Sequence, residues 1–177
     1  MTAETDIAAI DDSGANTASE VRTALTSVLA RGSDTHVVAQ MYRSSDQSLS
    51  SSVDDKIDFN AEDFDTDGSI VNTGSSRFDI QDTGYYRVDG FWPWSDPPND
   101  QWRLTIYVNG SEADCLMTRG ASASPISSSM AYISAVLYLE SSDYVELYAF
   151  TDGASGIVAR GGIYARIRAS MTIQRIV

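Results

Sequence analysis

Three aspartates at alternate positions are the residues best suited to bind a metal ion. Asp63, Asp65 and Asp67 precede Gly68, and alternate carboxylates before a glycine turn are typical of the start of a calcium loop. The twelfth position of such a loop is Gly74 instead of a bidentate glutamate, so an EF-hand is not expected. Two interpretations stay open: a looser site for calcium or another hard cation, and the favoured one, a solvated acidic turn.

Three tryptophans bracket a proline-rich loop at residues 93–101. An exposed indole beside aspartate and asparagine can hold a sugar, because the ring face is apolar and the polar groups hydrogen-bond. The same loop could dock a neighbouring protein, and the rings could simply pack beneath it, which is the interpretation we favour. The residues concerned are Trp92, Trp94 and Trp102.

Residues that usually carry acid–base and nucleophilic catalysis are scarce. His36 is the only histidine and Cys115 the only cysteine, which excludes an internal disulfide, a histidine cluster and a cysteine-based zinc site. The glycine-rich segments at 153–156 and 161–162 lack the lysine of a phosphate-binding loop. We therefore expect no enzyme.

The chain of 177 residues is strongly acidic. Asp and Glu number 25 against 12 Lys and Arg, a net charge of -13, and Lys56 is the only lysine. So much negative charge repels phosphate backbones and anionic lipids, so neither a nucleic-acid nor a membrane partner is expected. Enrichment in Asp, with Arg in place of Lys, indicates adaptation to high salt. The alternative is an acidic protein from a GC-rich genome.

An amphipathic helix is predicted near the N-terminus. Thr17 and Glu20 form a capping box, and Gly32 ends the apolar periodicity. A helix this short is marginal alone in water, so its apolar stripe must pack on its own domain, on copies of itself or on a partner. We predict that residues 1–32 are an arm and helix that dock on a partner. The docking stripe is Val21, Leu25, Val28 and Leu29.

The remainder, residues 33–177, has the pattern of a single β domain. Short apolar runs alternate with turn signals such as Asn109-Gly110, and no second helical segment follows. This pattern predicts an all-β sandwich or barrel. The expected strands are 36–42, 56–60, 77–80, 84–92, 102–108, 130–140, 144–150 and 162–177.

Several of these segments resemble the jelly-roll family of tumour necrosis factor and the complement globular head, particularly its branch in viruses of bacteria and archaea. They are KIDFN at 56–60, RFDI at 77–80, GYYRV at 84–88, LTIYVNG at 104–110 and AVLYLESSDYVEL at 135–147. The family usually has glycine where Ser142 stands. Residues 10–25 also look like short N-terminal modules of tailed-virus virion proteins. The resemblance implies a jelly-roll β-sandwich that forms compact homotrimers.

The resemblance also places strands 84–90, 144–150 and the last strand side by side in one sheet. In strand 84–90 the resemblance assigns Tyr86 and Val88 to the core, and in the other two strands alternation assigns one set of residues to the core. The remaining residues of all three strands form a shared outward face. That face is rich in aromatic residues and arginine, as protein interfaces are; a solvated face with cross-strand ion pairs is the alternative. The predicted trimer interface is Tyr85, Arg87, Asp89, Glu146, Tyr148, Phe150, Arg166 and Arg168.

Together these expectations describe a structural virion protein of a tailed virus with a halophilic host. A trimeric jelly roll would decorate the capsid or form a capsid or tail appendage, bound to other virion proteins through its N-terminal arm. The alternative is a receptor- or glycan-binding adhesion module of a fibre or spike, with a host-surface glycan or receptor as its partner. No cofactor is expected beyond the cation considered above.

Overall fold

The computed structural model describes residues 37–94, 101–113, 120–121, 129–151, 157–159 and 168–176. The chain divides into two compact units, Met1–Thr35 and His36–Val177, and every described residue belongs to the second. The predicted arm and helix of residues 1–32 lie outside them. All regular elements in the described part are strands, which confirms the all-β prediction. No described helix is long and apolar enough to cross a membrane.

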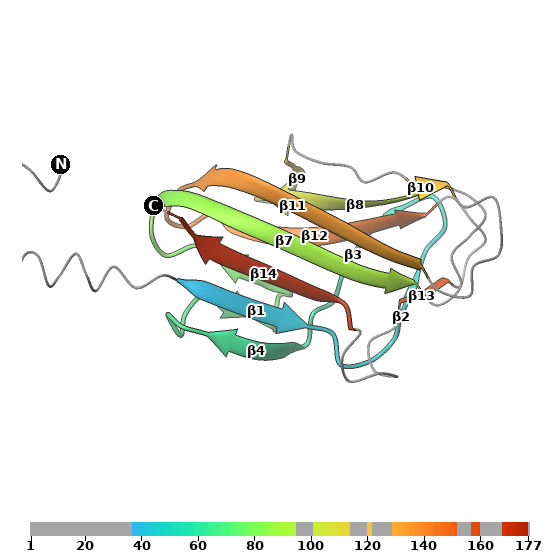
Figure 1. The fold of residues 1–177 in the computed structure, drawn as a ribbon, viewed down its shortest axis with the longest axis horizontal. Helices are drawn as coiled ribbons and strands as arrows, with labels where there is room; N and C mark the ends of the chain where they lie inside the picture. The colour runs from blue at the N-terminus through green and yellow to red at the C-terminus, as the bar shows by residue number, and fades with distance from the viewer. Residues whose placement is uncertain are drawn as a thin grey trace, which may run out of the picture. The chain divides into compact units, whose positions relative to one another are not determined.

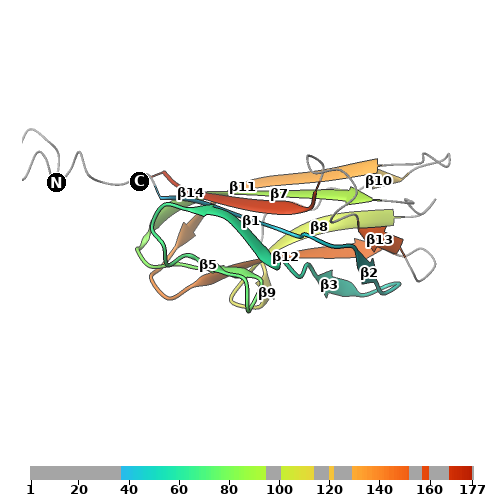
Figure 2. The ribbon, with the colours of Figure 1, turned by 90° about the horizontal axis from the view of Figure 1, so that it is seen from below.

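The strands form two antiparallel sheets that lie face to face (Figures 1 and 2). The first, sheet A, has the order β2-β13-β7-β14-β1-β4, and β11 pairs with the other side of β7 along its whole length. Its strands are β1 (Val38–Tyr42), β2 (Gln47–Leu49), β4 (Ala61–Asp65), β7 (Gly84–Trp94), β11 (Ser129–Leu139), β13 (Ile157–Ala159) and β14 (Ser170–Arg175).

Sheet B has the order β10-β8-β12-β6-β5. In addition, β3 pairs with β12 and β9 pairs with β8. Its strands are β3 (Asp54–Lys56), β5 (Val71–Asn72), β6 (Arg77–Asp79), β8 (Gln101–Val108), β9 (Ser111–Glu112), β10 (Gly120–Ala121) and β12 (Tyr144–Thr151). Most expected strands overlap these, but the expected strand at 56–60 continues past β3 only as irregular chain. Of the expected strand at 162–177, the described part is a strand over Ser170–Arg175, and residues 162–167 lie outside the described residues.

Two turns explain how neighbouring strands are joined. Asn109 and Gly110 have positive φ values of 54° and 74°, which suits the two-residue hairpin loop between β8 and β9. The turn from β11 in sheet A to β12 in sheet B places Ser142 at a φ of 82°. Glycine adopts that backbone at lower cost than serine, so the family's usual glycine at this turn has a physical reason.

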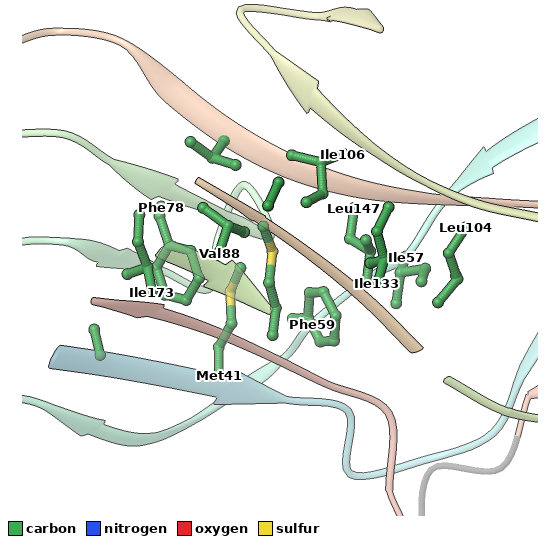
Figure 3. Packing of buried hydrophobic residues seen from close by; sticks show 14 of the residues in the cluster. Met41, Ile57, Phe59, Phe78, Val88, Leu104, Ile106, Ile133, Leu147 and Ile173 are labelled. Atoms are coloured by element: carbon green, nitrogen blue, oxygen red, sulfur yellow. The ribbon is translucent and has the colours of Figure 1, made fainter. Parts of the chain in front are cut away.

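The core lies between the two sheets (Figure 3). Gly90 of β7 faces this core: a Cβ there would lie 2.7 Å from Ile133 Cγ2 and 2.8 Å from Leu147 Cδ1, so any larger residue would force the neighbouring side chains apart. The described residues assigned to the core, by the resemblance for Tyr86 and Val88 and by alternation for the others, are buried, as predicted. They are Tyr86, Val88, Val145, Leu147, Ala149, Ala169, Met171 and Ile173. Ile167, assigned to the core in the same way as its neighbours, lies outside the described residues.

Candidate interaction surface

The outward face of sheet A exposes large apolar side chains on β7 and β11. Tyr85 lies opposite Tyr138, and Val136 lies opposite Arg87. The rings of Tyr85 and Tyr138 meet edge to face with their centroids 5.2 Å apart, yet each residue is more than half exposed, at 52% and 57%. We call this surface the β7–β11 face. Its exposed apolar members are Tyr85, Met130, Tyr132, Val136 and Tyr138.

Strand β11 is apolar on both of its sides. Ala131, Ile133 and Leu139 point into the core and are buried, while the alternate positions carry the exposed residues of the β7–β11 face. Strands that are apolar on both sides are typically buried on both sides. Within the described residues, only the inner side of β11 is covered.

A polar cluster lies in the middle of the β7–β11 face. The Tyr132 hydroxyl donates to Asp89 Oδ1 at 2.6 Å, and Arg87 Nε lies 3.0 Å from Asp89 Oδ2. Burial raises the pKa of Asp89, but hydrogen bonds from Ser134, Tyr132 and Arg87 outweigh it, so the pKa of this carboxyl lies below its ordinary value. Asp89 is therefore held as a carboxylate by its own chain.

The outward face of sheet B also carries aromatic residues, on β12, but other side chains of the same chain lie against them. The Arg77 guanidinium lies 4.3 Å from the Tyr144 ring centroid, and Arg103 lies 4.3 Å from that of Phe150. Tyr107 of β8 stacks on Tyr148 with their centroids 4.0 Å apart. We call this surface the β12 face.

Ion pairs complete the β12 face. Glu146 is only 6% exposed, and its carboxylate accepts a hydrogen bond from Lys56 Nζ, which also donates to the Ser75 carbonyl at 2.6 Å. Arg103 donates to both oxygens of Asp54, at 3.2 and 2.5 Å. The charged groups named here are thus paired within the chain.

Solved structures match this fold. The globular domain of a zebrafish complement 1qA protein has a TM-score of 0.59 at 14% identity, over 80% of this chain and 98% of that one. A crystal structure of murine APRIL has a TM-score of 0.58 at 10% identity, over 80% and 99%. No family model and no curated protein matches the sequence.

The domain is a complement- and tumour-necrosis-factor-like jelly roll. The described strands thereby confirm the fold that the resemblance implied. At sequence identities of 14% and 10%, this likeness establishes the fold and nothing about function. The function of this jelly roll therefore has to be argued from its own surface.

The expected arrangement of three strands in one sheet is wrong for one of them. β7 and β14 are neighbours in sheet A, but β12 lies in sheet B between β8 and the strands β3 and β6. Glu146, Tyr148 and Phe150 therefore do not share a face with Tyr85. The physical reason is that alternation fixes which side of a strand faces the core, but leaves open which sheet the strand joins.

The residues of β11 were missed as part of this face. The signal for them was present in the sequence, because both alternation sets of residues 129–139 are largely apolar. Of the two predicted arginines, Arg166 lies outside the described residues. Arg168 lies 3.4 Å from the Tyr42 ring centroid and donates to Asp63 Oδ2 at 2.5 Å, which places it beside β1 and β4, away from the β7–β11 face.

The three aspartates of the expected cation site have other contacts. Asp65 accepts four backbone N–H groups, from residues 67, 68, 70 and 71, at 2.8 to 3.0 Å. Asp67 accepts the Ser69 hydroxyl, and Asp63 binds Arg168. Among the described residues, no three acidic, histidine or cysteine side chains group closely enough to hold a metal ion. Asp65 and Asp67 therefore shape the turn after β4, and a site for calcium or another hard cation stays a prediction.

The tryptophan loop is only partly described. Trp92 is fully buried in the core, as the packing interpretation predicts for that residue. The side chains of Trp94 and Trp102 and residues 95–100 lie outside the described part. Glycan binding and protein docking by this loop stay predictions.

Proposed function

We propose that this jelly roll forms a homotrimer through the β7–β11 face and serves as a structural protein of a virion. The observation that carries the proposal is the uncovered apolar surface of β7 and β11, with Tyr85, Val136 and Tyr138 each more than half exposed. Contiguous exposed apolar patches of this kind mark interaction sites on soluble domains. The threefold copy number follows from the resemblance to a jelly-roll family that forms compact trimers.

The assembly is tested by measuring the mass of the full chain. Sedimentation velocity or native mass spectrometry in molar salt should report three copies at micromolar concentration. High salt is chosen because it screens repulsion among chains that each carry a net charge of -13. A chain that stays monomeric at micromolar concentration contradicts the trimer.

The virion role is supported by the resemblance of residues 10–25 to N-terminal modules of tailed-virus proteins, and the trimer is proposed to decorate the capsid or to form an appendage. Leu25 and Val28, in the predicted stripe of residues 1–32, would dock on the particle. The protein should co-purify with virus particles in fixed stoichiometry. Leu25→Asp with Val28→Asp should abolish that association and leave the trimer intact; recovery of the double variant on particles contradicts the docking role.

A further inference from the structure

The polar cluster of the β7–β11 face lies at the centre of the surface that the proposed trimer would bury. Asp89 is opposite Ser134 on β11 and opposite Thr172 on β14. Along the same β7–β11 ladder, apolar residues lie on both sides, with Tyr85 and Tyr138 toward one end and Met130 toward the other. A charged cluster amid apolar surface costs free energy on assembly unless every group in it is satisfied.

Asp89 meets this condition within its own chain. Its carboxylate accepts hydrogen bonds from Tyr132 at 2.6 Å and from Arg87 Nε at 3.2 Å, and its side chain is only a quarter exposed. These contacts let Asp89 enter an interface without being left as an unpaired charge.

Arg87, in contrast, is not fully satisfied within its own chain. Its side chain is half exposed, and its described contacts use Nε and one Nη2 hydrogen, the latter in a long 3.4 Å bond to the Tyr132 hydroxyl. A guanidinium has five N–H donors, so three of those of Arg87 have no acceptor among the described residues. If the β7–β11 face is buried, these donors need oxygen acceptors on another copy.

The edge of β11 provides such acceptors. Among the described strands, β11 pairs only with β7, so no described strand hydrogen-bonds to the backbone carbonyls along its other edge. Its eleven residues include no charge and no proline, the features that usually protect an exposed edge from pairing. Such an edge is suited to contact another chain, and it borders the β7–β11 face.

We propose that Arg87 fixes the register of the assembly by donating its outer N–H groups to backbone carbonyls on the β11 edge of an adjacent copy, while Asp89 and Tyr132 hold the guanidinium in place. This inference rests on the proposed trimer and identifies its specificity-determining residue. Apolar contacts alone are non-directional, whereas a planar guanidinium fork selects one geometry. A single polar group inside an apolar interface can set copy number in this way.

The test compares Arg87→Met with Arg103→Met in the full chain. Arg103 is the control, because it also pairs with an aspartate but lies on the β12 face, against the Phe150 ring. By sedimentation velocity and native mass spectrometry, Arg87→Met should raise the concentration for half-dissociation at least about tenfold and give mixed copy numbers. Arg103→Met should assemble like the unchanged chain. Arg87→Lys, which keeps the charge but loses the fork, should give an intermediate dissociation.

A second measurement separates a contact between copies from one within the chain. In a monomeric Met130→Asp background, whose new carboxylate lies opposite Pro93 and not opposite Arg87, Arg87→Met should lower the unfolding temperature no more than Arg103→Met does. Normal assembly of Arg87→Met, or a larger loss of stability than Arg103→Met in the monomeric background, overturns the register role. A monomeric unchanged chain would instead refute the proposed trimer itself, so the two failures are distinguishable.

Discussion

The two outward faces of the sandwich carry similar residues with different environments. On the β12 face, Tyr144, Tyr148 and Phe150 each lie against a side chain of the same chain. On the β7–β11 face, Tyr85 and Tyr138 contact each other and are still more than half exposed. Alternating aromatics on a strand are therefore a poor indicator of an interface by themselves. The informative feature is whether the chain provides its own cover for them.

The largest effect is expected from a charge on the uncovered face. Met130→Asp should abolish assembly, because a carboxylate buried among apolar residues costs several kcal/mol unless it is paired, and Met130 lies opposite Pro93. Sedimentation velocity should report a folded monomer. The matched control is Val53→Asp, since Val53 is 50% exposed but lies in the turn between β2 and β3. Equal loss of assembly in both variants would show that this face has no special role.

A charge removed from the covered face should act on folding instead. Lys56→Met leaves the nearly buried Glu146 carboxylate without its ammonium partner, which should lower the free energy of unfolding by about 1–3 kcal/mol. Lys56→Arg, which keeps a positive charge beside Glu146, should retain part of that free energy of unfolding. Denaturant unfolding in the Met130→Asp monomer isolates this effect. Reduced assembly without reduced stability would contradict the distinction between the faces.

The two faces should also respond to opposite ends of the pH scale. The pKa of Asp89 is lowered, so its contribution to stability is present above its ordinary value of 3.8 and is lost as the pH falls below it. Burial raises the pKa of Tyr148 above 10.0, so its contribution is present below that pH and is lost as the pH rises through the higher folded value. The fall in unfolding temperature at acidic pH should therefore be smaller in Asp89→Asn than in the unchanged chain, and the fall at alkaline pH should be smaller in Tyr148→Phe. If neither variant changes these falls, the two groups do not titrate differently on folding.

The smallest effect is expected at the turn that joins the two sheets. Ser142→Gly removes the cost of a side chain at a φ of 82°, and should raise the free energy of unfolding by about 0.5–1 kcal/mol. Ser141→Gly is the control, because Ser141 is not among the described residues with positive φ. Assembly should not change in either variant. A stabilisation by Ser141→Gly equal to that of Ser142→Gly would argue against relief of backbone strain.

Local patterns in the sequence predicted much of the fold. Alternation identified Leu147 and Met171 as core residues, and the Asn109-Gly110 pair identified a tight turn. The contacts that define the faces are not local: β12 pairs with β8 from about forty residues earlier, and Arg103 reaches Phe150 only because of that register. Such pairings depend on the whole sheet, so the sequence could not separate covered from uncovered aromatics.

The pairing of β1 with β14 has a practical consequence for handling the domain. The two strands are antiparallel neighbours, and the Arg175 amide donates to the Val37 carbonyl at 2.9 Å, so the chain enters and leaves the sandwich at the same pole (Figure 1). A purification tag or carrier protein fused next to Val37 or next to Ile176 would be attached at that pole. In a cyclic assembly every copy would therefore present its fusion on the same side.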